Sequence, residues 1–315
     1  MRLGPAILSR IYSRVSAGPW RTTTAVASET TDLEPAAPAM GTSSAAETDF
    51  GFSRVPVSQK TSMVADIFNR VAPKYDIMND LMSLAVHRLW KSYFVNQLSL
   101  MNVGIAPIHI LDVAGGTGDI GFRCIDALRR PQLDTILPSP RHHVTICDIN
   151  QAMLDVGAER AKSLGYVTDD RVVVDFLCAN AQNLVTVPDN SVDLYTIAFG
   201  LRNVTNKETA LLEAYRVLKP GGRFMCMEFS KVEYPGLKQI YDVWSFQAIP
   251  LLGDLIAQDR ASYQYLVESI RQFPSQDALC DMIHAAGFEQ VSYENLSGGI
   301  VAIHSGYKLH NDKLL

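Results

Sequence analysis

One stretch decides the fold, an apolar run that stops abruptly in small residues. It reads Ile108-His109-Ile110-Leu111-Asp112-Val113-Ala114-Gly115-Gly116-Thr117-Gly118-Asp119-Ile120-Gly121. The pattern predicts a buried strand that turns sharply into a helix. Glycines allow tight backbone conformations and close approach of a ligand, and the start of the helix offers unpaired N–H groups. We therefore interpret residues 115–118 as a cofactor loop.

Two cofactor classes compete for this loop. Gly116 to Gly121 satisfies the G-x-G-x-x-G pattern of dinucleotide-binding folds. Asp112, however, lies just before the glycines, where a carboxylate would repel a pyrophosphate. S-adenosylmethionine carries no phosphate, and its ammonium and sulfonium suit a nearby acid. The sequence therefore favours S-adenosylmethionine, with a dinucleotide-dependent oxidoreductase as the less favoured alternative.

Downstream of the loop, apolar β-rich runs alternate with helical periodicity. Strands are predicted at 144–148, 172–178, 192–198 and 223–229, and helices at 122–130, 152–164 and 207–218. The chain closes with a predicted helix at 275–286 and strands at 288–295 and 299–309. This alternation indicates an α/β fold with a mostly parallel doubly wound sheet and a C-terminal hairpin.

Composition excludes some classes of function. The chain has 315 residues, 47% of them hydrophobic, and a net charge of −5. No basic block interleaved with aromatic residues follows residue 30, so nucleic acid is not expected as a partner. No metal-ligand spacing is present, and we expect no metal.

The N-terminal part differs from the rest. Residues 1–28 contain four arginines and no acidic residue, which is typical of a mitochondrial transit peptide; a disordered tail is the alternative. Residues 29–57 are rich in Ala, Thr, Ser, Pro and Glu and are predicted to be a disordered linker. Residues 58–101 show helical periodicity and are expected to form a helical lid. Residues 131–143 are interpreted as a Pro-rich insertion without an assigned role.

Four motifs resemble the quinone C-methyltransferases of ubiquinone and menaquinone biosynthesis. They are Tyr75-Asp76-Ile77-Met78-Asn79-Asp80-Leu81-Met82-Ser83 with His87-Arg88-Leu89-Trp90-Lys91, then Leu111 to Asp119, Phe199-Gly200-Leu201-Arg202-Asn203-Val204, and Arg216 to Arg223. The resemblance covers about residues 58–308. It implies a class I, Rossmann-like methyltransferase fold over 58–310 and C-methylation of a polyprenyl methoxy-benzoquinol with S-adenosyl-L-methionine. A noncatalytic cofactor-binding component of a quinone-biosynthesis complex is the alternative.

The cofactor-binding residues expected from the motifs span three strands. Asp148 ends the second strand, where an acid commonly accepts the ribose hydroxyls. Asn180 stands where relatives often carry an acid, and its amide still accepts and donates at an adenine edge. The expected set is Asp112, Gly115, Gly116, Thr117, Gly118, Asp148, Asn180 and Ala181.

Ring methylation needs a positioned quinol and a route for its hydroxyl proton. Arg202 and Asn203 are the first candidates; an arginine stays protonated, so it stabilises a phenolate or orients a water. Its alternative role is a structural ion pair. Tyr75, Asp76 and Asn79 are expected in the substrate pocket, and His87 is interpreted as structural.

The resemblance and the leader also predict a place in the cell. They imply a peripheral position on the matrix face of the mitochondrial inner membrane, with other ubiquinone-biosynthesis proteins as partners and a homodimer left open. Residues 231–275 are apolar and helical, and are expected to receive the polyprenyl tail or to form core. The stretch is too short and too broken to span a membrane.

Overall fold

Seven strands form one sheet in the order β5-β4-β3-β6-β7-β9-β8. Their bounds are β3 His109–Val113, β4 His142–Asp148, β5 Val172–Cys178, β6 Val192–Ala198, β7 Leu218–Phe229, β8 Glu289–Leu296 and β9 Val301–Tyr307. Strands β3 to β7 are parallel to one another, whereas β9 runs antiparallel to both β7 and β8. The predicted class I methyltransferase fold with a C-terminal antiparallel hairpin is confirmed.

The computed structural model describes residues 47–71, 80, 83, 85–100, 106–129, 141–254 and 259–309. The predicted transit peptide therefore lies outside the described residues, as do Tyr75, Asp76 and Asn79. Most of the predicted insertion also lies outside them, but His142 and His143 belong to β4, so the strand begins earlier than expected.

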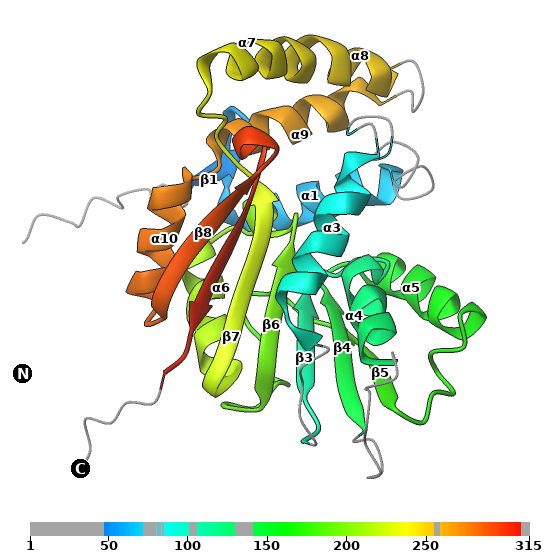
Figure 1. Ribbon diagram of the computed structural model, residues 1–315. Coiled ribbons are helices and arrows are strands. Elements are labelled where there is room, and N and C mark those ends of the chain that lie inside the picture. The colour runs from blue at the N-terminus through cyan, green and yellow to red at the C-terminus, as the bar shows by residue number, and fades with distance from the viewer. Residues whose placement is uncertain are drawn as a thin grey trace, which may run out of the picture. The chain divides into compact units, whose positions relative to one another are not determined.

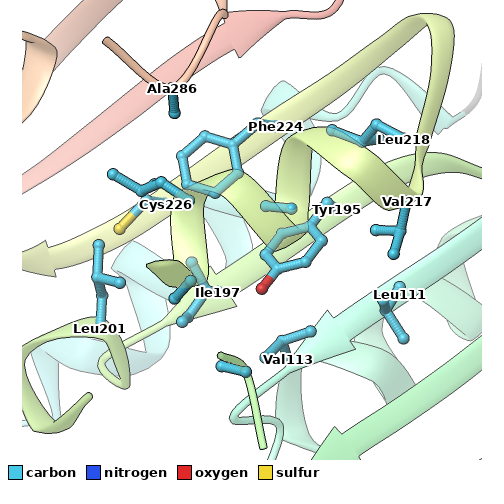
Figure 2. Packing of buried hydrophobic residues seen from close by; sticks show 14 of the residues in the cluster. Leu111, Val113, Tyr195, Ile197, Leu201, Val217, Leu218, Phe224, Cys226 and Ala286 are labelled. Carbon is cyan, nitrogen blue, oxygen red and sulfur yellow. The ribbon is translucent and has the colours of Figure 1, made fainter. Parts of the chain in front are cut away.

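Alternating side chains of the strands build a separate core on each face of the sheet. On one face, Leu111, Tyr195 and Phe224 pack with α6 (Lys207–Val217) and α10 (Gln276–Ala285). Figure 2 shows this packing, in which the rings of Tyr195 and Phe224 lie 5.6 Å apart. These side chains are buried almost completely, as expected for strands covered by helices on both sides.

The opposite face carries the second core. Ile110, Ile146 and Met225 pack there with α3 (Val86–Gln97), α4 (Asp119–Arg129) and α5 (Gln151–Ser163). Adjacent residues of one strand thus contribute to opposite cores, because side chains in a strand alternate between faces.

A group of helices lies beyond the end of the sheet at which β7 ends (Figure 1). It comprises α7 (Pro235–Val243), the π-helix η4 (Trp244–Ala248), α8 (Ile249–Leu252) and α9 (Arg260–Gln272). In Figure 1, α9 lies between the sheet and the pair α7 and α8. No helix in the described part of the chain is long and apolar enough to span a membrane.

The predicted linker is wrong at its C-terminal end. Glu47–Phe50 (β1) and Ser53–Pro56 (β2) form an antiparallel hairpin, and Val57–Val71 (α1) follows directly. The hairpin contacts the rest of the fold through Phe50, whose ring stacks on the ring of Tyr265 in α9 with the ring centroids 4.4 Å apart. Local composition did not reveal this contact because its partner is more than two hundred residues away in the sequence.

Candidate functional site

The glycine loop begins with a strained residue. Ala114 follows β3 with a φ of 53°, and Gly116 and Gly118 have φ values of 55° and 90°. Only glycine adopts such angles without steric cost, so Ala114 is an unusual residue at this position. The Gly200 Cα lies so close that a Cβ there would stand 2.3 Å from the Ala114 Cβ. Gly200 of the Phe199–Val204 motif therefore makes room for Ala114.

Asp112 contacts the start of the glycine loop and the helix that follows it. Its carboxyl group is fully buried; one oxygen accepts from the Gly121 N–H at 3.0 Å and the other from the Thr196 hydroxyl at 2.8 Å. Burial raises its pKa to about 7. Gly115 lies directly against it, since a Cβ there would stand 2.9 Å from an Asp112 oxygen. Asp112 thus fixes the start of α4 and the turn above it.

Asp148 ends β4 beside the same loop. One carboxylate oxygen accepts from the Gly116 N–H at 2.9 Å and the other from the Asn150 N–H at 2.8 Å. Burial raises its pKa, and these backbone bonds oppose the rise. Residue 148 therefore links the loop to the end of the second strand and still lines the cleft above them.

The cleft has a volume of about 150 Å³ and contains most of the expected cofactor residues. Its lining includes Asp112, Gly115, Gly116, Thr117, Asp148, Asn180 and Ala181. Gly118 is not part of the lining; its φ of 90° and the Phe122 ring beneath it give it a role in the turn itself. Among the described lining residues, Lys91 is the one cation, and it pairs with Asp119 at 2.6 Å.

A second, larger cavity of about 510 Å³ adjoins the cleft. Its walls come from α3, α7, α9 and the loop after β6, and they are mainly apolar and aromatic, including Trp90, Phe229, Leu237, Ile240, Trp244 and Tyr265. Lys91, Phe199 and Asn203 line both spaces. These three residues therefore form the wall that the two compartments share.

Arg202 lies at the floor of the larger cavity in a buried ion pair. Its guanidinium donates to Glu228 at 2.8 Å and to the Phe199 carbonyl, and both charged side chains are about 95% buried or more. Its Nε has no partner among the described residues. The arrangement includes the ion pair that was the alternative role for Arg202, and it also places Arg202 on the cavity wall.

Asn203 is held by the neighbouring helix. Its side-chain oxygen accepts from the Tyr265 hydroxyl of α9 at 3.1 Å. Burial raises the pKa of Tyr265 to about 12, so this hydroxyl remains a donor at neutral pH. The Asn203 amide is therefore oriented at the shared wall.

Sequence reasoning missed three features of the site. Phe199 has a φ of 56°, a strained angle for an aromatic residue, and hydrogen bonds from its N–H to the Met227 carbonyl and from Arg202 to its carbonyl hold it at the shared wall. Lys91 belongs to a motif used for the resemblance, but the helical pattern did not reveal that it faces both spaces. His87 lines the larger cavity although it was interpreted as structural.

Comparison with known proteins now identifies the family. The model of the ubiE/COQ5 methyltransferase family matches residues 56–308. The chain belongs to this family. A ubiquinone/menaquinone biosynthesis C-methyltransferase of Methylobacterium nodulans is 53% identical over 264 residues, which cover 83% of this chain and 97% of that protein. The protein of the same name from Brucella abortus strain S19 is 51% identical over 275 residues, covering 86% and 94%.

The residues of the cleft fit the methyl donor of this family. The carboxylates of Asp119 and Asp148 line it against one lysine, Lys91, which pairs with Asp119. That balance suits a cofactor with an ammonium and a sulfonium and opposes a pyrophosphate. The chain is an S-adenosylmethionine-dependent methyltransferase, and the prediction of its cofactor is confirmed. The described residues contain no group of three potential metal ligands.

Proposed function

We propose that this chain methylates a ring carbon of a polyprenyl methoxy-benzoquinol in ubiquinone biosynthesis. The observation that carries the proposal is the apolar cavity of about 510 Å³ that shares a wall with the cofactor cleft. Its volume lies within the roughly 300–1,000 Å³ typical of small-molecule sites. An aromatic ring with an apolar tail matches such a lining better than a charged or sugar-like substrate does.

The residues at the shared wall have distinct roles in this proposal. S-adenosylmethionine supplies an electrophilic methyl group when bound. Phe199 and Asn203 position the ring so that its carbon faces that methyl group, which lowers the entropic part of the barrier. Arg202 stabilises the negative charge that develops on the quinol oxygen, and Glu228 fixes the orientation of its guanidinium. Tyr75, Asp76 and Asn79 are proposed to complete the ring pocket.

The cofactor residues divide between direct contact and support. Asp148 is proposed to accept the ribose hydroxyls, Asn180 and Ala181 to contact the adenine, and Thr117 to contact the methionyl end. Thr117 is fixed by Arg160, which donates to its hydroxyl oxygen at 2.8 Å. Asp112 acts through the loop that it organises.

The tail needs a route from the cavity to a membrane. Ile240 lines the cavity and is nevertheless 70% exposed, so α7 forms part of the mouth. Val243, Phe246 and Leu251 continue the exposed apolar surface along the same helical region. We infer that the protein binds peripherally to the matrix face of the mitochondrial inner membrane through this region, together with other proteins of the pathway.

The direct test is turnover with labelled S-adenosylmethionine and a reduced, short-tailed methoxy quinol. Transfer of label to the ring supports the proposal, whereas tight cofactor binding without transfer to any quinol would support the noncatalytic alternative. A fusion of residues 1–28 to a fluorescent reporter tests the location separately. A cytosolic reporter would contradict the mitochondrial part and leave the chemistry unaffected.

A further inference from the structure

Deprotonation of the quinol requires an acceptor in the larger cavity. A phenol becomes a strong carbon nucleophile only as its hydroxyl proton leaves. Arg202 cannot accept a proton, and the nearby Glu228 is committed to the Arg202 guanidinium and to the Phe229 N–H. The cavity lining, as far as the structure describes it, contains no Asp or Glu. It contains one side chain whose ordinary pKa lies near neutrality, His87.

His87 is held as a directed base. Its Nε2 lies 2.8 Å from an Asp80 carboxylate oxygen, and Arg88 donates to both oxygens of Asp80 at 2.6 and 2.5 Å. The bonds from Arg88 and from His87 lower the pKa of Asp80 to about 2, so its carboxylate is ionised and can only accept. The Nε2 atom must therefore carry a hydrogen, and Nδ1 of the neutral ring presents a lone pair.

The Nδ1 atom is buried and has no partner among the described residues. The His87 side chain is only 10% exposed, and it lines the cavity one helical turn before Lys91, which reaches the wall shared with the cofactor cleft. An acceptor without a partner is costly to bury. The His87 ring lines the cavity while Nδ1 itself is covered, so the quinol hydroxyl reaches Nδ1 through a small adjustment of the ring or its neighbours when the quinol binds. The same carboxylate–imidazole arrangement orients histidine bases in hydrolases.

We propose that His87, oriented by Asp80, accepts the hydroxyl proton of the quinol. This inference rests on the proposed function. The proton moves from the hydroxyl to Nδ1 and leaves a quinolate, whose ring carbon forms a bond to the methyl carbon while the methyl–sulfur bond breaks and its electron pair stays on sulfur. The methylated carbon then loses its hydrogen as a proton to water, and His87 returns its proton to the oxygen. One proton is released in total.

Burial, more than the nearby charges, favours the neutral form of His87 before the reaction. Burial lowers the pKa of His87, Lys91 on the same helix lowers it further, and Asp80 and Asp119 of α4 oppose this. Among the described residues, the other titratable groups that line the cavity are Arg202 and the tyrosines of α7 and α9, Tyr241, Tyr263 and Tyr265. The base is therefore in its accepting form at neutral pH.

The test compares four full-length proteins in methyl transfer to a reduced short-tailed quinol between pH 5.5 and 9. They are the wild type, His87→Gln, Asp80→Asn and, as a matched control, His143→Gln. His143 also pairs with a carboxylate, Asp175 at 2.6 Å, but it lies on β4 outside the cavity. We expect His87→Gln to lower kcat by ~10²- to 10⁴-fold at pH 7 with little change in quinol KM or cofactor affinity.

The pH profile distinguishes a base from a packing residue. The kcat of the wild type should fall on the acidic side as His87 becomes protonated, and this decline should be absent in His87→Gln. The difference in kcat between the wild type and His87→Gln should also become smaller towards pH 9, where the quinol begins to ionise without a base. Asp80→Asn should reduce kcat less and move the acidic decline to lower pH, because the carboxylate that raises the pKa of His87 is gone.

Three results would overturn the inference. One is a His87→Gln protein with wild-type kcat and an intact acidic decline. If the melting temperature shows that this variant does not fold, the second result is an Asp80→Asn protein whose kcat declines at the same acidic pH as that of the wild type. Equal losses in His87→Gln and His143→Gln would also contradict it. A wild-type protein that transfers no methyl group to quinols would contradict the proposed function. Failure of the proposed function can therefore be distinguished from failure of the inference about His87.

Discussion

The cofactor cleft and the larger cavity share a wall but are built in different ways. The cleft comes mainly from the segments at the carboxyl ends of β3, β4, β5 and β6, with α1 and α3 beside them. The backbone N–H of Gly116 in the loop bonds to Asp148, and that of Gly121 in α4 bonds to Asp112. The cavity comes from side chains of α3, α7 and α9, helices far apart in the sequence. The polar part of the cleft is thus fixed by backbone hydrogen bonds near the strand ends, whereas the cavity depends on the packing of side chains from separate helices.

This difference predicts how each compartment responds to substitution. Changes in the cleft should alter cofactor affinity, since its residues act before the chemistry. Changes in the cavity should alter turnover or the choice of quinol and leave cofactor affinity intact. Variants that mix the two effects would contradict the division.

Apart from the His87 variant, the largest expected effect is on turnover, from Arg202→Lys. Lysine keeps the charge but loses the rigid, planar guanidinium, whose Nη1 donates to both Glu228 and the Phe199 carbonyl. We expect kcat to fall by on the order of 10²-fold, as for loss of one oxyanion donor, with unchanged cofactor affinity by calorimetry. Arg216→Lys on α6, which also removes an Arg–Glu pair, is the matched control and should keep its kcat.

The Arg202 variant has an informative contrary outcome. If kcat survives and only the quinol KM rises, Arg202 binds the ground state and does not stabilise the transition state.

The next effect concerns the cleft, through Asp148→Ala. The variant loses the proposed ribose acceptor and the partner of the Gly116 N–H. Cofactor affinity should weaken by ~1–3 kcal/mol in calorimetry. Asp175→Ala, an exposed carboxylate of β5, should leave the affinity unchanged. An unaltered affinity in Asp148→Ala would show that the ribose lies elsewhere.

The Asp112→Asn variant tests how Asp112 supports the glycine loop, through the dependence of protein stability on pH. The folded state raises the pKa of Asp112 from 3.8 to about 7, so it retains a proton that the unfolded chain releases. The Asp112 contribution to stability is therefore present below pH 3.8 and is lost as the pH rises to about 7. Asparagine does not ionise, and its amide can accept from the Gly121 N–H and donate to Thr196.

The stability of Asp112→Asn relative to the wild type should therefore improve between pH 4 and 7 in denaturant titrations. Its loss of cofactor affinity should be smaller than that of Asp148→Ala. A stability difference that stays constant over this range would contradict the buried, proton-retaining state of Asp112.

The smallest effect is expected at the mouth of the cavity, from Ile240→Glu. Ile240 is mostly exposed, so folding should be unaffected, but a carboxylate there opposes passage of an apolar tail. The kcat/KM for a long-tailed quinol should fall by the equivalent of ~1–2 kcal/mol, while a short-tailed quinol is spared. The control is Gln239→Glu, an exposed neighbour outside the cavity lining. Equal losses on both quinols would place the tail elsewhere.

The sequence predicted the cleft better than the cavity for a physical reason. Asp112, Gly116 and Asp148 lie at strand ends, and parallel strands bring their carboxyl ends to one edge of the sheet. The strands at 172–178 and 192–198 are confirmed with the predicted bounds, because each is a short run of mainly apolar and β-branched residues.

The cavity could not be predicted in this way. Nothing in the local pattern of α3 shows that His87 and Lys91 face a space closed by α7 and α9. The β1–β2 hairpin was missed because its stabilising contact, Phe50 on Tyr265, is long-range. The motif at 199–204 predicted Arg202 and Asn203 as neighbours of the chemistry, but not the buried Glu228 that fixes the guanidinium.

The central claim is that the two compartments meet at Lys91, Phe199 and Asn203. A crystal structure with S-adenosylhomocysteine and a short-tailed methoxy quinol tests it most directly. We predict that the sulfur faces this wall and that the methyl-accepting carbon lies across it, so that a methyl carbon built on the sulfur stands ~3–3.5 Å from that carbon. A quinol bound outside the larger cavity, or a sulfur turned away from the shared wall, would contradict the account.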